Sequence, residues 1–355
     1  MKVSPQRPDK LPSLLSPNWP IKWQLKAIFA DLQYVYNLAF HLLAGRERQA
    51  TPVIRFYGDG SISADYDKPV CFFCSYDSES IVRKNVHHYL DELAHAGFNI
   101  VFISSSNAIR DADLEKLSRC CIRIMNRENK GYDFYGWKTG LEKYAEYKCH
   151  SGLLLANDSV FGPIFSISDI IERVNSCNAD MVGMTESFRF HRHLQSYFIY
   201  CKKNVFLSEE FTEFFRGVDS LELKIAIIRK YEVGFSRLLG RQFRLSALYD
   251  LEMVLARADY HQRPVNWVES TFHLWKPLIT EFKFPFLKKS VLTRRGVFLE
   301  EIRAVLAESG SSYDLDILND WVVPPVNARC IAWASWPRAR TERLARLAID
   351  AKPDR

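Results

Sequence analysis

The sequence has no apolar run close to the roughly 18 uninterrupted residues that a membrane-spanning helix needs. Its first 20 residues have no apolar stretch of the kind found in secretory signals. It also has neither the GxxxxGK(S/T) phosphate loop nor the GxGxxG dinucleotide fingerprint. These absences argue against a membrane-spanning or secreted protein and against the common triphosphate- and dinucleotide-binding enzymes.

A basic stripe of the nucleic-acid-binding type is also missing. The net charge is +6, but Lys and Arg are dispersed along the chain with an excess near its C-terminal end. A net charge of this size is compatible with an anionic membrane or a phosphate-bearing substrate as well as with nucleic acid. Because the basic stripe is missing, nucleic acid is not among the expected partners.

The spacing of the eight cysteines does not match a disulfide framework, because they are scattered and lie mostly in apolar runs. Cys71 and Cys74 resemble a CxxC pair, but positions three apart in a strand point to opposite faces. The sequence predicts buried free thiols and a reducing compartment. The expected location is the cytoplasm, with contact to the inner face of the plasma membrane as an open possibility.

The folded part alternates strand-like and helical patterns. Strand-like runs at residues 70–76, 98–106, 121–127 and 152–159 are separated by helical patterns at 78–97, 111–121 and 132–147. This alternation predicts an α/β fold with a mostly parallel, Rossmann-like sheet flanked by helices, in which ligands bind at the carboxyl ends of the strands.

Polar residues follow two of these strands. Asn129, Gly131 and Asp133 come after the third, and Asn157, Asp158 and Ser159 end the fourth. Glycine suits close approach of the backbone to a ligand, and a carboxylate at a strand end suits sugar hydroxyls or a cation such as Mg²⁺ or Mn²⁺. Two alternatives stay open: Asp133 as an ordinary helix N-cap and Asp158 as a cap of the following turn.

Six motifs occur in order between about residue 70 and residue 292: "NRENKGYDFYGWKTGL", "LLLANDSVFGP", "DMVGMTES", "HLQSYF", "YEVGFSRLL" and "FHLWKPLI…FKFPFLKKSVL". Together they resemble the rhamnan synthesis protein F family of bacterial polysaccharide glycosyltransferases. The resemblance implies a GT-A-like fold and a nucleotide-sugar co-substrate. It also implies transfer of a sugar, often a deoxyhexose such as L-rhamnose, to O-antigen, capsule or rhamnan on a lipid carrier.

The resemblance also implies roles for the strand-end residues. The "NKGYD" segment takes the place of a donor-binding segment, which makes Asn129, Gly131 and Asp133 donor-site candidates. The "ANDS" segment takes the place of an Asp-x-Asp motif in which only Asp158 is acidic. A single carboxylate holds a diphosphate-bound cation less firmly than two, so dependence on Mg²⁺ or Mn²⁺ is in doubt.

An inverting transfer needs a general base for the acceptor hydroxyl. Glu232, ahead of a helical run, is preferred, and Glu186 in "MTES" is the competitor. The acceptor-side candidates are residues that alternate along a predicted strand and residues that combine an aromatic platform with a cation: His193, Gln195, Tyr197, His273, Trp275 and Lys276. Core packing of these side chains is the alternative.

The predicted organisation has five parts. Residues 1–20 are a mobile arm, and residues 21–48 are an amphipathic helix that either packs on the core or lies in a membrane interface. Residues 66–262 are the nucleotide-sugar-binding catalytic domain, residues 263–330 an acceptor-side covering segment, and residues 331–355 a basic amphipathic tail. The alternative function is a non-catalytic scaffold that binds nucleotide-sugar or glycan in a polysaccharide assembly complex.

Overall fold

The structure is a computed structural model. It describes residues 53–221, 223–258, 260, 264–293 and 297–321, together with eight helical positions between residues 21 and 36. The predicted arm (1–20), the predicted tail (331–355) and most of the predicted helix at 21–48 lie outside the described residues. None of the helices in the described part has the length and apolar character needed to cross a membrane.

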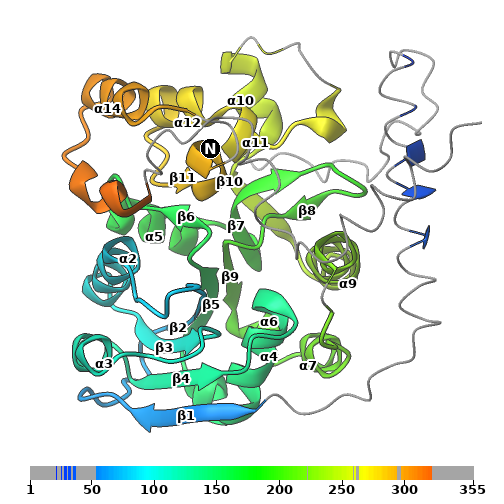
Figure 1. The fold of residues 1–355 in the computed structure, drawn as a ribbon. Coiled ribbons are helices and arrows are strands. Elements are labelled where there is room, and N and C mark those ends of the chain that lie inside the picture. The colour runs from blue at the N-terminus through cyan, green and yellow to red at the C-terminus, as the bar shows by residue number, and fades with distance from the viewer. Residues whose placement is uncertain are drawn as a thin grey trace, which may run out of the picture.

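A nine-stranded sheet forms the centre of the described part (Figure 1). Its order is β1-β4-β3-β2-β5-β9-β7-β10, and β8 pairs with β7. The strands are β1 (Ile54–Asp59), β2 (Val70–Ser75), β3 (Asn99–Ser104), β4 (Arg123–Arg127), β5 (Gly152–Asn157), β7 (Met181–Ser187), β8 (His193–Leu194), β9 (Phe198–Lys202) and β10 (Leu245–Tyr249). A second, two-stranded sheet pairs β6 (Val160–Phe161) with β11 (Leu287–Lys288) in antiparallel fashion.

The main sheet is mixed and not purely parallel: six of its nine strands share one direction, and β1, β8 and β9 run against them. The strands β4, β3, β2 and β5 run parallel, and so do β7 and β10. However, β9 lies antiparallel between β5 and β7, and β1 lies antiparallel on the edge beside β4. The reversal of β9 follows from its connection, because the short segment after β7 holds only β8 and a turn, whereas a parallel neighbour needs a crossover of about a dozen residues.

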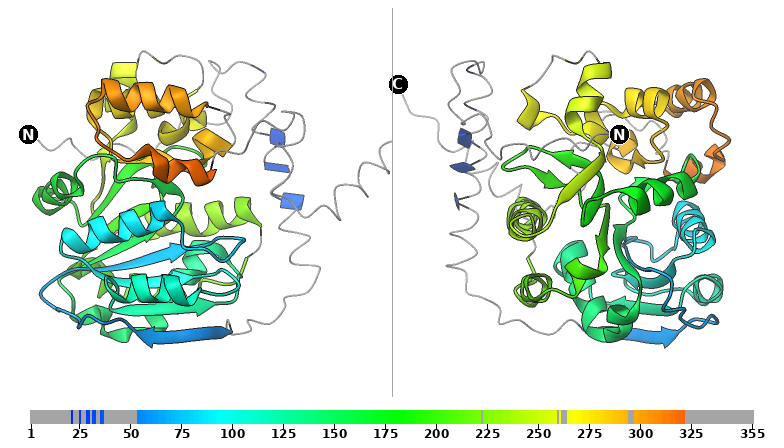
Figure 2. Two further views of the ribbon diagram at one scale, coloured as in Figure 1. Left: turned by 60° about the vertical axis from the view of Figure 1, so that its left-hand side comes forward. Right: turned by 180° about the vertical axis from the view of Figure 1, so that it is seen from behind.

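Helices cover both faces of the sheet. They are α2 (Lys84–His95), α3 (Asp111–Ser118), α4 (Tyr132–Lys143), α5 (Ile167–Ser176), α6 (Lys203–Phe206), α7 (Glu209–Arg216), α8 (Lys224–Ile227), α9 (Gly234–Leu239), α10 (Leu251–Ala258), α11 (Ser270–His273), α12 (Trp275–Phe282), α13 (Lys289–Thr293) and α14 (Leu299–Glu308). Short 3₁₀ segments are η1 (Ala145–Cys149), η3 (Val265–Trp267) and η4 (Leu315–Trp321), and η2 (Ile228–Val233) is a π-helix. In Figures 1 and 2, α2 and α3 lie on one face, and α4, α7 and α9 lie on the other.

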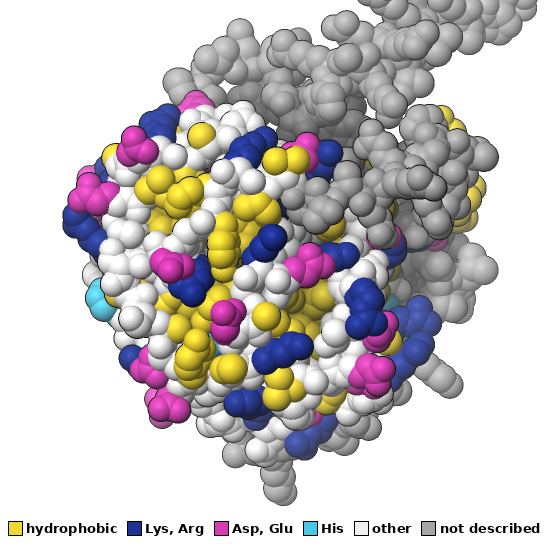
Figure 3. Space-filling model, turned by 90° about the horizontal axis from the view of Figure 1, so that it is seen from below, with side chains coloured by type: hydrophobic (Ala, Val, Ile, Leu, Met, Phe, Trp, Pro, Cys, Tyr) yellow, Lys and Arg dark blue, Asp and Glu magenta, His cyan; other side chains and the backbone are white. Residues whose placement is uncertain are grey.

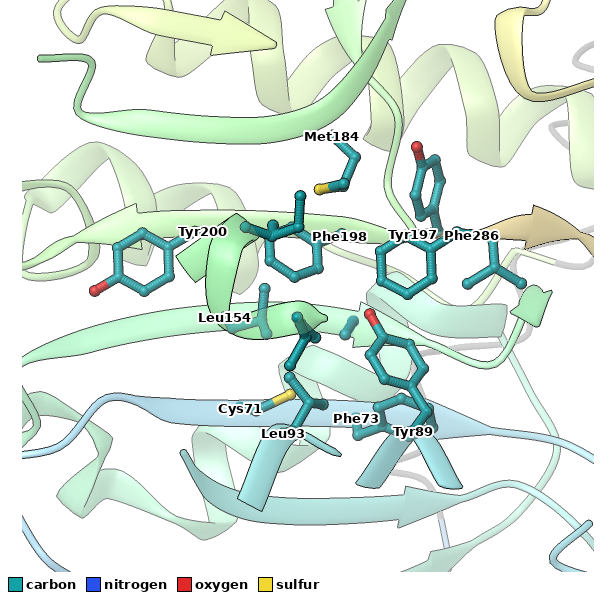
Figure 4. Packing of buried hydrophobic residues seen from close by; sticks show 14 of the residues in the cluster. Cys71, Phe73, Tyr89, Leu93, Leu154, Met184, Tyr197, Phe198, Tyr200 and Phe286 are labelled. Carbon is teal, nitrogen blue, oxygen red and sulfur yellow. The ribbon is translucent and has the colours of Figure 1, made fainter. Parts of the chain in front are cut away.

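The alternation of strand side chains produces two hydrophobic cores. Cys71 and Phe73 of β2 belong to the core under α2, α3 and α5, whereas Phe72 and Cys74 belong to the core under α4, α7 and α9. Figure 4 shows the first core, where Phe73, Tyr89 and Phe286 meet. The two cysteines thus face opposite sides of the sheet as free, buried thiols, which confirms the prediction from their spacing.

The C-terminal part of the described chain has a third core of its own. Residues of α12, α13, α14 and η4 pack on β6 and β11 and form a layer at one end of the main sheet (Figure 2). Trp275 and Phe161 are among the buried side chains of this core. The packing brings the segment 283–293 against the end of β5, about 130 residues earlier in the chain.

Charges of both signs are interspersed on the face seen from below in Figure 3, between scattered apolar side chains. The strand at this side is β1, whose Phe56 and Tyr57 are partly exposed. Among the described residues, this face therefore carries no patch made of basic side chains alone.

Candidate functional site

Arg127, the last residue of β4, organises the loop that leads into α4. Its buried guanidinium donates to the carbonyl oxygens of Glu128 at 2.9 Å, Lys130 at 2.6 Å and Tyr132 at 2.8 Å. The loop closes on Gly131, which has a φ of +71° in the left-handed region that favours glycine. The loop is thereby fixed from within by one arginine, and α4 begins directly after it.

Asp133 lies in the first turn of α4, and Asn129 lies exposed on the preceding loop. Asn157 Nδ2 donates to Asp133 Oδ2 at 3.0 Å. Burial, followed by the negative charge of Asp158, raises the pKa of Asp133 from its ordinary 3.8 to about 7, against the opposing charges of Arg127 and Lys224. Asp133 therefore changes protonation state near neutral pH.

Asn157 ends β5 and forms a tight polar turn with Ser159. Asn157 Oδ1 accepts from the backbone N–H of Ser159 at 3.0 Å and from its hydroxyl at 2.6 Å. The same amide group also donates toward the carbonyl oxygen of Ser196 at 3.5 Å. Both ends of the Asn157 side chain are thus held, and the turn presents the residue between them, Asp158, toward the end of β2.

Asp158 joins three segments at the carboxyl ends of the strands. Its Oδ2 accepts from the Ser75 hydroxyl at 3.2 Å and from the Tyr76 N–H at 3.5 Å. The same oxygen lies 3.2 Å from Nζ of Lys289, which comes from the C-terminal layer. This carboxylate is therefore oriented by hydrogen bonds and balanced by a cation.

Glu232 lies in the π-helix η2, directly before α9. Its Oε1 accepts from the backbone N–H of Ser196 at 2.9 Å. Because Asn157 donates to the carbonyl of the same residue, Ser196 links Glu232 to the end of β5. The negative charge of Glu232 also contributes to the raised pKa of Asp133. The structure thus brings together Asp133, Asn157, Asp158, Ser159 and Glu232, and short π-helical segments are frequent at functional sites.

Glu186, the competing candidate base, is engaged elsewhere. Its side chain is almost fully buried, forms an ion pair with Arg192 at 2.7 Å, and accepts from the backbone N–H of Leu251 at 3.3 Å. These contacts tie the end of β7 to the hairpin with β8 and to the start of α10. The carboxylate therefore has an evident structural role.

The acceptor-side candidates at the β8–β9 connection are buried. His193 Nδ1 lies 2.7 Å from the carbonyl oxygen of His191. The Thr185 hydroxyl is 2.7 Å from both Gln195 Oε1 and the Tyr197 hydroxyl. Only His193 belongs to a strand, and Figure 4 shows Tyr197 next to Phe286 in the first core. The side chains of Gln195 and Tyr197 point to the same side of the chain, as predicted for alternating positions, and both contact Thr185 there.

The candidates on α11 and α12 contact their own layer. His273 Nδ1 accepts from the backbone N–H of Glu269 at 2.8 Å, and Trp275 is buried in the third core. Lys276 pairs with Glu301 at 2.6 Å. These contacts match the packing alternative that the sequence left open for all three, and their role toward an acceptor stays a prediction.

The side chains do not form an evident cation site. Over the residues that the structure describes, no group of three or more His, Cys, Asp or Glu side chains is arranged to hold a metal ion. Asp158 stands beside an amide and a hydroxyl, and the nearest charge is the ammonium of Lys289. The donor set therefore does not fit Mg²⁺ or Mn²⁺ held by protein ligands alone.

Sequence reasoning missed three side chains of this site: Arg127, Lys224 and Lys289. Arg127 had no signal, because a basic residue ending a strand is common. Lys289 lies in the "FKFPFLKKSVL" motif and Lys224 in a helical run, and nothing local links either residue to the end of β5. Only the tertiary packing brings these cations to the carboxylates.

A family model described as rhamnan synthesis protein F matches residues 100–323. The chain is 31% identical to the uncharacterized protein y4gN of Sinorhizobium fredii over 174 residues, which are 47% of this chain and 45% of y4gN. It is 24% identical to the virulence protein VirA of Vibrio anguillarum over 277 residues, which are 70% of this chain and 87% of VirA. The match thus spans less than half the length of y4gN.

Two solved structures resemble the chain weakly. The mannosyltransferase PcManGT of Pyrobaculum calidifontis, in complex with GDP-Man and Mn²⁺, aligns over 93% of this chain and 90% of its own with 11% identity and a TM-score of 0.32. The glycosyltransferase GlyE of Streptococcus pneumoniae aligns over 72% of this chain and 63% of its own with 12% identity and a TM-score of 0.32. Both TM-scores are low.

Proposed function

Since the chain belongs to the rhamnan synthesis protein F family, we propose that it is a glycosyltransferase of polysaccharide synthesis. In this proposal, it transfers a sugar from a nucleotide-linked donor to a growing cell-surface polysaccharide. The observation that carries the proposal is the grouping of Asp133, Asp158 and Glu232 at the carboxyl ends of the strands, where α/β sheets bind their ligands. No phosphate loop is needed for such a donor.

The donor occupies the ends of β4 and β5 in this proposal. Asn129, Gly131 and Asp133 line its nucleotide-sugar part, and Asn157, Asp158 and Ser159 lie at its diphosphate. A protonated Asp133 donates a hydrogen bond to a sugar or ribose oxygen, which an ionised carboxylate cannot do. Its pKa of about 7 makes this form available at neutral pH.

Glu232 is the proposed general base of an inverting transfer. It removes the proton of the acceptor hydroxyl while the oxygen attacks the anomeric carbon. The bond from that carbon to the diphosphate breaks, and its electron pair leaves with the nucleotide. The position of Glu232 beside the strand ends supports this role, and the structural contacts of Glu186 with Arg192 and Leu251 favour Glu232 over it.

The acceptor in this proposal is a lipid-linked oligosaccharide of O-antigen, capsule or rhamnan, and the sugar is L-rhamnose or another deoxyhexose. Contact with the inner face of the plasma membrane is supported by apolar residues of the N-terminal helical segment. Seven of its described side chains are between 49% and 74% exposed, at helical spacing: Ile21, Leu25, Ile28, Phe29, Leu32, Val35 and Tyr36. An exposed apolar face of this kind suits an interfacial helix.

The test combines ligand binding with turnover. Nucleoside diphosphates and their sugars are screened by thermal unfolding, and transfer is then assayed on lipid-linked acceptor with the stabilising donor. Replacing a general base lowers the rate by about 10²- to 10⁴-fold, so Glu232→Gln is expected to lose transfer but to keep donor binding. Asp158→Ala is expected to lose both.

Glu142→Gln, an exposed change on α4, is the matched control and is expected to behave as wild type. Full transfer activity in both Glu232→Gln and Asp158→Ala contradicts the assignment. Donor binding with no turnover on any acceptor favours the non-catalytic scaffold, which the incomplete acidic motif at Asn157, Asp158 and Ser159 supports.

A further inference from the structure

Asp158 lies where the resemblance places a metal-binding acidic motif, yet its neighbours do not complete one. The amide of Asn157 is held at both ends, by Asp133 on one side and by Ser159 on the other. Burial and the charge of Asp158 raise the pKa of Asp133 to about 7, so this side chain is only partly ionised at neutral pH. Asp158 is therefore the only acidic residue of the "ANDS" segment at the end of β5.

A positive charge already stands at this carboxylate. Nζ of Lys289 lies 3.2 Å from Asp158 Oδ2, and the two side chains are 14% and 17% exposed. The pair is thus accessible from solvent without being loosely placed at the surface. An ammonium has three N–H donors, and the contact with Asp158 uses one of them.

Three further contacts fix the position of Lys289. Its backbone N–H donates to the carbonyl oxygen of Ser159 at 3.0 Å, directly beside Asp158. The preceding residue, Lys288, pairs with Val160 in the small sheet of β6 and β11. The ammonium also lies 4.3 Å from the ring centroid of Trp321, a cation–π distance. The C-terminal layer therefore delivers this cation to the end of β5.

We propose that Lys289 is the phosphate-binding cation of the site and takes the place of a divalent metal ion at the donor diphosphate. This inference rests on the proposed function, because it names the group that binds the diphosphate of that donor. A lysine ammonium binds phosphate as a point charge. Asp158 holds the ammonium at the strand ends, and a phosphate oxygen becomes its second partner.

The charge balance of the site agrees with this role. A diphosphate brings negative charge to a place that already holds Asp158 and Glu232. The ammonium of Lys289 compensates the charge of Asp158 within 4 Å. The positive charges of Lys224 and Arg127 oppose the rise in the pKa of Asp133. The protein thus supplies three positive side chains where an ion held by acidic ligands was expected.

Titration calorimetry of the full chain tests the proposal with UDP, GDP, dTDP and inorganic pyrophosphate, each in EDTA and in Mg²⁺ or Mn²⁺. We expect wild type to bind a diphosphate equally well in EDTA and with metal. Loss of one charge-assisted contact weakens binding by about 10- to 100-fold, which is expected for Lys289→Met, while Lys289→Arg is expected to retain most of the affinity. Arg303→Met is the control, since it removes a surface cation of the same layer that has no proposed role in binding.

The possible outcomes separate this inference from the proposed function. Binding that requires Mg²⁺ or Mn²⁺ overturns the inference, and this comparison uses wild type alone, so it decides even if a Lys289 variant fails to fold. Equal affinity of Lys289→Met and wild type also overturns it, with the proposed function intact if transfer persists. If no diphosphate binds wild type with or without metal, the proposed donor site itself is wrong, and the inference falls with it.

Discussion

The side-chain amide of Asn157 donates to the carboxyl group of Asp133 at 3.0 Å and so joins the end of β5 to the first turn of α4. An acid at position 157 would place two carboxylates against each other beside Asp158, at a considerable electrostatic cost. The amide instead stabilises the partly buried Asp133 and holds Ser159 with its oxygen. The single acid of the "ANDS" segment is therefore a consequence of what packs against it.

The raised pKa of Asp133 predicts a pH-dependent stability. In the unfolded chain this group ionises near 3.8, whereas in the folded protein it ionises near 7. Folding stability is fully present below the lower value and is lost as pH rises through the higher one. Asp133→Asn removes this loss, so we expect the variant to be more stable than wild type by about 2 kcal/mol near pH 8, after allowance for partial exposure.

The check is urea unfolding of both proteins across the range from about pH 4 to about pH 8. The advantage of Asp133→Asn is expected to shrink toward the acid end, where wild type also carries the proton. Asp67→Asn, at an exposed position, serves as the control. A stability difference that stays constant with pH would show that Asp133 titrates normally.

Backbone conformation at Gly131 gives a second prediction. A Cβ at this position would lie 2.6 Å from Cβ of Tyr135 and 3.0 Å from Cα of Ser220, and the φ of +71° disfavours any side chain. We expect Gly131→Ala to lower the free energy of unfolding by about 2–4 kcal/mol, from strain and overlap together.

Gly97→Ala separates these two contributions. Gly97 has a φ of +88°, but a Cβ there meets no atom within 4 Å. Its alanine variant is expected to lose only about 1 kcal/mol, from backbone strain alone. Equal losses for the two glycines, measured by thermal unfolding, would contradict close packing around the loop after β4.

The two candidate bases are expected to respond differently to the same change. Glu186 is almost fully buried in its ion pair with Arg192, so Glu186→Gln is expected to cost about 2–3 kcal/mol of stability. Glu232 is half-buried, and Glu232→Gln is expected to change stability by less than about 1 kcal/mol.

Parallel measurements of unfolding and of transfer on both variants check this contrast. We expect Glu186→Gln to keep its turnover below its unfolding temperature, whereas Glu232→Gln loses it. A stable Glu186→Gln that is inactive would move the base to the end of β7 and remove Glu232 from that role.

The local parts of this fold could be predicted from the sequence because their causes are local. The apolar runs that became β2, β3, β4 and β5 alternate with amphipathic helices, and the polar residues at 129–133 and 157–159 follow two of those strands directly. The direction of β9 could not be read in this way. It depends on the short connection after β7, where the alternation of His193, Gln195 and Tyr197 predicts one strand and the structure has β8, a turn and β9.

Long-range partners explain the remaining differences. Lys289 is 131 positions from Asp158 in the chain, and no periodicity connects them. The sequence predicts Trp275 as an aromatic platform for a sugar, and this role stays a prediction. The layer of α12 and α14 that buries its side chain is visible only in the structure. The residue types thus predicted which polar side chains lie near the strand ends. Tertiary packing determines which of the predicted side chains are buried and which charged groups pair with each other.

Trp137 gives a last prediction, because it links α4 to the middle of the sheet. Its indole is fully buried, and Nε1 donates to the carbonyl oxygens of Phe72 at 3.1 Å and Ala156 at 3.3 Å, on the adjacent strands β2 and β5. Trp137→Phe loses these bonds and leaves a small cavity. We expect the free energy of unfolding to fall by about 3 kcal/mol.

Trp275→Phe is the matched control, since Trp275 is also buried but makes no side-chain hydrogen bond within the described part of the chain. It loses a similar ring volume, and a loss smaller by about 1–2 kcal/mol is expected in urea unfolding. Equal losses would mean that the two carbonyl bonds contribute nothing. A larger loss for Trp137 also predicts weaker donor binding in that variant, because α4 carries Asp133 one turn before the indole and its position at the strand ends depends on this anchor.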